Sequence, residues 1–187
     1  MSAAVQNNML VFAKKYGNDM LEALNGSDIY FPLMLAQASL ESGYGTSAAA
    51  KNKNNFFGVM YGGSTKKFPS AKDAFAKQVE MFYKPNLPYQ ANGVTTATSP
   101  YDQARKIANS GYYSLANDNT LPASMKAKIA KNGFTQKDSA DWYYKKLKTM
   151  IDDALIVLPL GKINDASIAQ AGNIINTQKI IAIWQKM

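Results

Sequence analysis

The sequence predicts a mainly helical domain that carries one small β-hairpin. Apolar residues recur every three or four positions, as in Val5, Met9 and Phe12, which is the spacing of a helix face packed on a core. Gly62-Gly63 separates two short strand-like segments and is typical of a tight hairpin turn. The chain has 187 residues, 47% of them apolar, and can therefore bury the core of about one domain.

Apolar spacing, helix caps and glycine or proline breakers set the expected bounds of each element. The first helix should end at Gly17, and residues 86–99 should form a polar surface loop near the cleft. The hairpin should pair residues 57–61 with 66–68. The expected helices cover residues 3–16, 19–24, 32–42, 48–51, 70–83 with Ser70 as the cap, 102–109, 123–131, 139–157, 165–171 and 176–184.

Glu41 is the residue that most strongly indicates chemistry. It lies in the last turn of the helix expected from Pro32 to Ser42, and Gly43 supplies the left-handed conformation that commonly ends a helix. Apolar neighbours and the negative end of the helix dipole both disfavour the charged carboxylate and raise its pKa. A glutamate that keeps its proton suits general acid catalysis. Spacing alone leaves open a second interpretation, a solvated glutamate that happens to end a helix.

The residues around Glu41 decide between these interpretations because they form a wider motif. Residues 41–47 read ESGYGTS, and residues 54–59 read NNFFGV. Together they resemble the signature of the bacterial glucosaminidases of glycoside hydrolase family 73, which includes autolysins and flagellar peptidoglycan hydrolases. Weaker similarity continues through residues 68–75, 109–112 and 144–151. The resemblance covers roughly residues 3–155, with an apparent insertion between Leu115 and Asp138.

This resemblance implies a fold, an activity and two catalytic residues. The fold would be a lysozyme-like α+β domain, mainly α, with its small β-hairpin beside the active-site cleft. The activity would be hydrolysis of the β-1,4 bond after N-acetylglucosamine in peptidoglycan, with Glu41 as general acid and Tyr112 as the family's cleft tyrosine. We expect residues 1–158 to form this domain and residues 159–187 to form a helical extension packed on it.

Candidate substrate-binding residues flank these motifs: Tyr44, Asn55, Phe57, Tyr61 and Tyr113. Aromatic rings can stack on the apolar face of a sugar, and we expect one of Phe56 and Phe57 to be buried while the other lies nearer the cleft. The amide of Asn55 has two interpretations of equal weight, binding the acetamide of the substrate or stabilising a turn.

A second catalytic carboxylate is missing from its usual place. Many members of the family carry an acid on the hairpin, but residues 60–67 contain no Asp or Glu. Either the 2-acetamido group of the substrate assists, which is an accepted exception to the two-carboxylate rule, or Glu80 or Asp102 reaches the cleft. We favour assistance by the substrate. Asp73 is sufficiently explained by its place in the first turn of a helix.

Composition narrows the chemistry further. The sequence has no cysteine and no histidine, which excludes disulfides, the usual zinc sites, thiol nucleophiles and Ser-His triads. We therefore expect no metal and no cofactor. The formal net charge of +8 suggests anionic partners such as wall polymers. The lysines are dispersed and no nucleic-acid-binding motif is present, so we expect no nucleic-acid partner.

The first eight residues lack the basic start and apolar stretch of a secretory signal, and no apolar run could span a bilayer. An enzyme acting in the periplasm or cell wall would then need a specialised secretion machine, phage delivery or a signal already removed. We expect a monomer that binds peptidoglycan strands, with an inhibitor or immunity protein as a further candidate partner. The alternative functions are a muramidase of the same fold and a catalytically weak cell-wall-binding or assembly module of a phage tail or secretion system.

Overall fold

The computed structural model describes residues 3–118 and 121–160 of the chain. In these residues, short turns connect α-helices, two 3-10 turns and one two-stranded antiparallel sheet: α1 (Ala3–Leu24), α2 (Phe31–Ser42), α3 (Ala48–Lys53), β1 (Met60–Tyr61), β2 (Ser64–Thr65), α4 (Ala71–Tyr83), α5 (Pro88–Ala91), η1 (Val94–Thr96), α6 (Pro100–Asn109), η2 (Leu115–Asn117), α7 (Ala123–Asn132) and α8 (Gln136–Leu160). The prediction of a mainly helical fold with one hairpin is confirmed.

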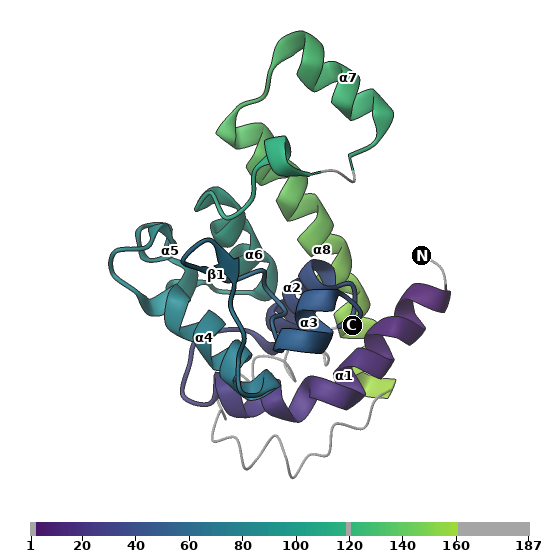
Figure 1. Ribbon diagram of the computed structural model, residues 1–187, viewed down its shortest axis with the longest axis vertical. Helices are drawn as coiled ribbons and strands as arrows, with labels where there is room; N and C mark the ends of the chain where they lie inside the picture. Colours follow the sequence, from purple (N-terminus) through teal and green to yellow (C-terminus); the bar gives the residue numbers. More distant parts are fainter. Residues whose placement is uncertain (1–2, 119–120, 161–187) are drawn as a thin grey trace.

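Helix α2 lies at the centre of the body. It packs against α8, α1 and α6, while α1 also packs against α4 and α8. Nearly all of its residues are buried, as expected of a helix that is apolar around most of its circumference. Figure 1 shows that α8 begins at the end of the molecule where α7 stands apart and runs from there into the body. The central position of α2 fixes the place of Glu41 near its last turn.

The first helix does not end at Gly17, so that prediction is wrong. Helix α1 continues through Gly17 to Leu24 and replaces the two expected helices with one. Met9, Ala13, Met20 and Leu24 are all buried, so the apolar stripe continues on both sides of the glycine. A glycine inside a helix costs only about 1 kcal/mol relative to alanine, and burial of the stripe against neighbouring helices outweighs that cost.

The hairpin forms where the double glycine predicts it, although its strands are shorter than expected. Met60 pairs with Thr65 and Tyr61 with Ser64. Both turn glycines have positive φ, at 57° and 78°, which is the conformation that favours glycine in tight hairpin turns. One further backbone bond, from Lys66 N to the carbonyl of Val59 at 2.9 Å, extends the pairing beyond the strands.

Residues 86–99 are more ordered than the predicted surface loop. They contain α5 and η1, and the side chains of Tyr89, Val94 and Ala97 are buried. Helix α6 begins at Pro100, two residues earlier than predicted, because Ser99 caps it by accepting a hydrogen bond from the backbone N–H of Asp102. The predicted cap of α4 is confirmed, since the hydroxyl of Ser70 accepts from the backbone N–H of Asp73 at 3.2 Å.

The last described helix, α8, begins three residues earlier than predicted and continues to Leu160. The helices expected at residues 165–171 and 176–184 lie outside the described residues. The division into residues 1–158 and 159–187 therefore stays a prediction. Among the helices that the structure describes, none combines the length and the apolar character needed to cross a bilayer.

Candidate active site

Glu41 lies in the last turn of α2, where its side chain reaches the surface, and the helix ends one residue later at Ser42. Gly43 caps the helix in the left-handed conformation, with φ at 57°, and Tyr44 follows in the same region at 58°. The buried hydroxyl of Ser42 donates to the carbonyl of Ala38 at 2.5 Å and accepts from the backbone N–H of Gly45 at 2.8 Å. This turn holds the end of α2 in place beneath Glu41.

Gly45 is required at this turn for reasons of space as well as conformation. Its φ is +76°, and a Cβ added there would lie 2.9 Å from the ring of Phe12 on α1. The turn after Glu41 is therefore pressed directly against the core, which gives the acid a rigid support.

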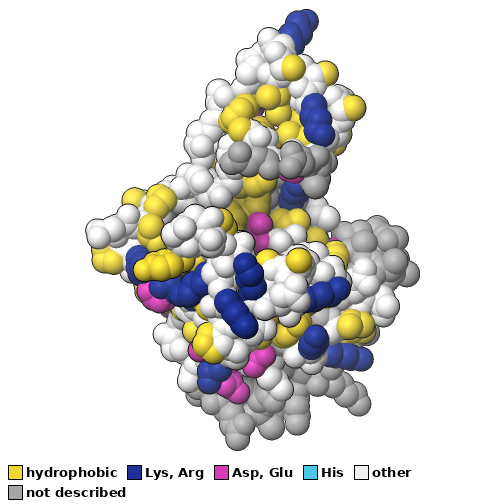
Figure 2. All heavy atoms as spheres, viewed as in Figure 1, with side chains coloured by type: hydrophobic (Ala, Val, Ile, Leu, Met, Phe, Trp, Pro, Cys, Tyr) yellow, Lys and Arg dark blue, Asp and Glu magenta, His cyan; other side chains and the backbone are white. Residues whose placement is uncertain are grey.

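The side chain of Glu41 is accessible to solvent, although neighbouring residues exclude much of the water around its carboxyl group. More than a third of the residue's surface is accessible, but desolvation by its neighbours is the largest influence on the carboxyl and raises its pKa. A carboxyl that is accessible and yet desolvated by its neighbours is expected in an open depression of the surface. Figure 2 shows such a hollow between the body and the α7 end, with hydrophobic and acidic side chains exposed in it.

Tyr143 on α8 is the direct partner of Glu41. Its hydroxyl donates to Glu41 Oε1 at 2.7 Å, and the tyrosine itself is only 1% exposed. The hydrogen bond from Tyr143 and the charge of Lys146 lower the pKa of Glu41, whereas the charge of Asp118 adds to the raising effect of burial. The net pKa of Glu41 is raised, as the sequence predicts for a general acid.

A buried chain of hydrogen bonds fixes the hydroxyl of Tyr143. Gln37 Nε2 donates to that hydroxyl at 3.3 Å, and Gln78 Nε2 donates to Gln37 Oε1, also at 3.3 Å. Both glutamines are fully buried, and they connect α4 to α2 and α8. Since this donor chain ends at Glu41, the phenol points its proton at the carboxyl group.

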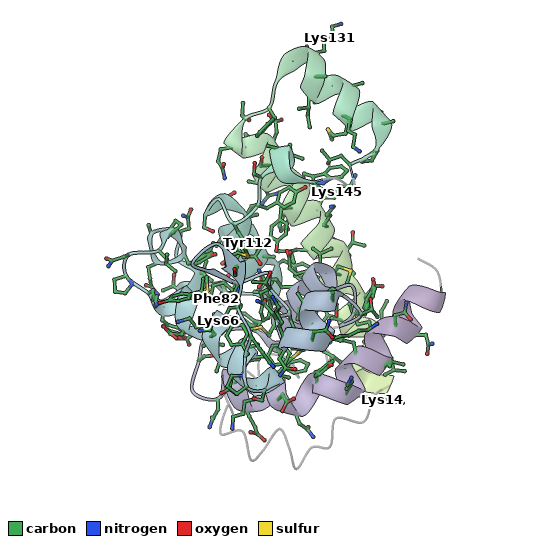
Figure 3. The ribbon with its side chains drawn as sticks, in the orientation of Figure 1. Lys14, Lys66, Phe82, Tyr112, Lys131 and Lys145 are labelled. Carbon is green, nitrogen blue, oxygen red and sulfur yellow. The ribbon has the colours of Figure 1, made fainter. Side chains whose placement is uncertain are left out.

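Tyr143 is also held between two other tyrosine rings. The ring of Tyr112 lies 5.2 Å from it at an interplanar angle of 29°, and the ring of Tyr113 lies 5.2 Å away at 12°. Gly111, with φ at 80°, turns the chain after α6 so that both rings reach α8. Figure 3 shows Tyr112 near the middle of the molecule, between the body and the α7 end. The three rings form a wall beside Glu41.

Tyr112, the second predicted catalytic residue, lies beside the acid. Its hydroxyl donates to the carbonyl of Phe57 at 3.4 Å and so joins the wall of tyrosines to the segment that leads into the hairpin. Burial, together with the charge of Glu41, raises its pKa well above the ordinary value, so the phenol stays protonated. Tyr113 is partly exposed, and its hydroxyl donates to Asp118.

The predicted substrate-binding residues before and on the hairpin divide into two kinds. Tyr61 is 82% exposed on β1, so its ring is available to a ligand. Phe56 and Phe57 are both buried, which contradicts the expectation that only one of the two rings is buried. Phe57 packs edge-on against Phe75 of the core, with ring centroids 5.9 Å apart. Only the backbone of Phe57 reaches the site, through its bond from Tyr112.

Asn55 serves the hairpin and not a ligand, which corrects its predicted role in substrate binding. Its Nδ2 donates to the carbonyls of Val59 and Lys66, each at 2.8 Å, and its Oδ1 accepts from the backbone N–H of Val59 at 3.0 Å. The residue is 1% exposed, so no substrate acetamide can reach the amide. Of the two interpretations that the sequence left open, the structure supports the turn.

Tyr44 is partly buried and lies away from the tyrosine wall. Its hydroxyl contacts the sulfur of Met150 at 3.8 Å, about two turns of α8 beyond Tyr143. Burial raises its pKa, with a further contribution from the charge of Asp153. No described contact joins its side chain to Glu41, so its role in binding stays a prediction.

The acidic residues considered as the second catalytic carboxylate bind other partners, away from Glu41. Glu80 points away from the site, because Gln78 on the same helix points inward and two residues rotate a helix by about 200°. Hydrogen bonds from Lys77 and Lys84 lower the pKa of Glu80. The geometry therefore contradicts Glu80 as a catalytic base.

Asp102 and Asp73 serve their own helices. Asp102 accepts from the backbone N–H of Thr98 at 3.0 Å, which lowers its pKa, and it pairs with Lys106. Asp73 accepts from the hydroxyl of Ser70 at 2.6 Å. In the described part of the chain, no group of three or more acidic side chains is placed to hold a metal ion.

Three residues beside the acid, Tyr143, Lys146 and Asp118, were not predicted as site residues. Tyr143 lies 102 positions from Glu41 in sequence and meets it only because α8 packs on α2. The spacing of Tyr143 from the core residue Leu147 is a signal that could have indicated an inward-facing tyrosine. Nothing comparable marks Asp118, which lies in the apparent insertion.

The described residues form a mainly helical domain with one hairpin, and an enclosed glutamate lies at the end of its central helix, an arrangement consistent with a lysozyme-like fold. The sequence model of the glucosaminidase family, described as mannosyl-glycoprotein endo-beta-N-acetylglucosaminidase, matches residues 17–155. The chain belongs to this glucosaminidase family, and the resemblance predicted from residues 41–59 is confirmed. No curated protein and no solved structure matches the chain.

Proposed function

We propose that this chain hydrolyses the β-1,4 glycosidic bond that follows N-acetylglucosamine in peptidoglycan, with Glu41 as general acid. The observation that carries this proposal is the environment of Glu41, which is accessible to a ligand and yet desolvated enough to raise its pKa. An acid that stays protonated toward neutral pH can protonate the leaving-group oxygen of a glycoside. Membership of the glucosaminidase family supports the bond and the polymer.

The hydrogen bond from Tyr143 determines which oxygen of Glu41 carries the proton. Oε1 accepts from the phenol, so the acidic proton belongs on Oε2. Burial raises the pKa of Tyr143 well above the ordinary value, so it remains a donor throughout the working range. Tyr143 is thus a positioning residue that fixes the rotamer and protonation site of the acid.

The tyrosines around the depression supply the sugar contacts. Tyr112 takes the second catalytic role, since it lies against Tyr143 and is coupled electrostatically to Glu41. The exposed ring of Tyr61 and the partly exposed ring of Tyr113 present flat apolar faces on which a sugar can stack. Tyr44 remains a candidate for a more distant sugar.

We assign the second catalytic function to the 2-acetamido group of the substrate. Glu80 pairs with Lys77, Asp73 accepts a hydrogen bond from Ser70, and Asp102 pairs with Lys106. None of these three carboxylates is directed at Glu41 by these contacts. Asp118 is closer to the acid, but Lys146, Trp142 and Tyr113 already donate to it, which makes it a weak base. Hydrolysis assisted by the substrate needs no second carboxylate.

The family acts on peptidoglycan, which indicates a setting at the cell wall. We propose that glycan strands are the substrate and that anionic wall polymers add nonspecific attraction to a chain of formal charge +8.

Product analysis tests the bond specificity. Purified peptidoglycan would be digested, reduced with borohydride and analysed by mass spectrometry, with Glu41→Gln as the control digest. We expect N-acetylglucosaminitol at the new ends with the wild-type protein alone. Muramitol ends would show a muramidase of the same fold, and tight binding to the wall without soluble products would show a binding module.

A further inference from the structure

A cluster of charged and aromatic side chains surrounds Asp118, close to the proposed acid. Asp118 follows η2, at the start of the segment that leads to α7. Its Oδ2 accepts from Lys146 Nζ at 2.8 Å, from Trp142 Nε1 at 3.4 Å and from the hydroxyl of Tyr113. Its side chain is only 7% exposed.

Among the ion pairs of the described residues, the pair of Asp118 and Lys146 has the most buried carboxylate. Pairs such as Lys72 with Glu22 are more than half exposed, and such surface pairs contribute little to stability. The pair of Asp118 and Lys146 is 7% and 28% exposed, so both charges are partly removed from water. Losing one member would remove an opposite charge from a partly buried site, which is costly.

The cluster reaches Glu41 along two paths. The first is geometric: Asp118 holds the hydroxyl of Tyr113, whose ring lies nearly parallel to that of Tyr143, and Tyr143 donates to Glu41. The second is electrostatic: the negative charge of Asp118 and the positive charge of Lys146 act on the carboxyl with opposite signs.

We propose that Asp118 and Lys146 form a positioning pair for the general acid, in which Asp118 holds Tyr113 against Tyr143 and balances the charge of Lys146 beside Glu41. This inference rests on the proposed function, in which Glu41 is the acid. Asp118 touches neither the reacting bond nor Glu41 in this arrangement, so it acts through its neighbours and is not a catalytic residue.

The groups that face Glu41 come from two parts of the chain. Helix α8 contributes Tyr143 and Lys146, while the segment after α6 contributes Tyr112, Tyr113 and Asp118. The three tyrosines have raised pKa values and stay neutral, mainly because of burial. The charges that act on the carboxyl of Glu41 from the described residues are those of Lys146 and Asp118.

Substitution of Asp118 and substitution of Lys146 should shift the pKa of Glu41 in opposite directions. Asp118→Asn removes a negative charge that raises the pKa of Glu41, while the positive charge of Lys146 still lowers it, so the pKa of Glu41 should fall. The alkaline limb of the pH–activity profile, where the acid loses its proton, should move to lower pH by roughly half to one unit, since direct contact with a charge shifts a pKa by about 1–3 units. Lys146→Gln should move the limb to higher pH, and the double variant should restore it toward wild type.

Asp152→Asn is the matched control. Asp152 also lies on α8 and accepts from a tyrosine hydroxyl and a lysine, Tyr101 at 2.8 Å and Lys148 at 3.0 Å. It does not appear among the groups that act on Glu41. Its variant should leave the alkaline limb in place, even where it lowers the melting temperature.

A direct titration separates this inference from the proposed function. The pKa of the Glu41 carboxyl would be followed by carbon-13 NMR in wild-type protein, Asp118→Asn, Lys146→Gln and Asp152→Asn. The titration needs no activity, so it reports on the pair even if the protein proves to be a binding module. Shifts of opposite sign in the two cluster variants are expected. Unmoved titrations in both, or shifts of the same sign, would overturn the proposal, and Lys146→Gln alone decides it if Asp118→Asn does not fold.

Discussion

Two regions meet beside Glu41 and are stabilised in different ways. Helices α2 and α8 share a core of fully buried side chains, including Leu33 and Leu147. Helix α7, in contrast, contains no buried residue and stands apart from the body, with Lys131 near its outer end. The first region holds the acid by close packing. The second, the apparent insertion, touches the acid's surroundings at its beginning, through the polar cluster at Asp118.

The packed region determines the position of the Glu41 carboxyl, whereas the segment that leads to α7 adjusts the pKa of that carboxyl. The packed region fixes where the carboxyl of Glu41 lies, because α2, its turn at Gly45 and Tyr143 are all braced by the core. The segment that leads to α7 contributes a charge, through Asp118, that adjusts how strongly the acid keeps its proton. Substitutions in the two regions should therefore have different signatures.

Truncation of a core side chain should give the largest effect on stability. Leu147→Ala in α8 leaves a cavity beneath the site and should cost about 2–5 kcal/mol of unfolding free energy. Ile129→Ala on α7, where the residue is only partly buried, should cost less than about 1 kcal/mol. Urea unfolding monitored by circular dichroism measures both. Equal losses would show that α7 is packed as tightly as the body.

Substitution in the turn after Glu41 should give the next largest loss of stability. Gly45→Ala forces a Cβ against the ring of Phe12 and leaves a residue with a side chain at φ +76°. We expect a loss of about 1–3 kcal/mol, with a fall in activity because the end of α2 shifts. Gly62→Ala, at the hairpin turn where a Cβ would meet no neighbour within 4 Å, is the matched control for backbone conformation. If Gly45→Ala loses no more unfolding free energy than Gly62→Ala, the contact between residue 45 and Phe12 does not contribute to the loss.

Tyr112 lies where the two regions meet, and its hydroxyl should matter more for rate than for stability. Tyr112→Phe keeps the ring stacked on Tyr143 but removes the 3.4 Å bond to the carbonyl of Phe57. We expect roughly a tenfold fall in kcat, about 1.4 kcal/mol, with the melting temperature nearly unchanged. Turnover on purified peptidoglycan and thermal unfolding distinguish the outcomes, and a large fall in melting temperature at preserved rate would indicate a packing role.

The smallest expected effect is on stability as a function of pH. The pKa of Glu41 is raised in the folded protein, so its ionisation costs stability as pH rises from the unfolded pKa through the folded one. Glu41→Gln should therefore be slightly more stable than wild type at neutral pH and equal to it at pH values below the unfolded pKa. The accessible position of Glu41 keeps the gain small. Melting temperatures across this range measure it, and a variant less stable at neutral pH would contradict the sign.

Features set by neighbouring residues could be predicted from the sequence, and features set by distant packing could not. The bounds of α2 follow from Pro32 and Gly43, and the environment of Glu41 follows from the apolar helix around it. The continuation of α1 through Gly17 depends on other helices, so a local breaker gave the wrong answer. The role of Asn55 required the hairpin carbonyls to which it donates.

The partners of the acid illustrate the same limit. Tyr143 and Asp118 come near Glu41 through the packing of α8 and the course of the chain after α6, which no local pattern specifies. Glu80 and Gln78 illustrate the converse, because helix periodicity tells that they lie on opposite faces but not which face meets α2. The structure resolves this in favour of Gln78.

The most direct test of the account is the turnover of purified peptidoglycan by Glu41→Gln, compared with wild type and with Glu80→Gln. The two variants make the same chemical change, one at the enclosed acid and one at an exposed glutamate paired with Lys77 and Lys84. Loss of a general acid should lower the rate of Glu41→Gln by about 100–10,000-fold, while Glu80→Gln stays near wild type. A Glu41→Gln variant that folds and keeps near-wild-type turnover would contradict the central claim.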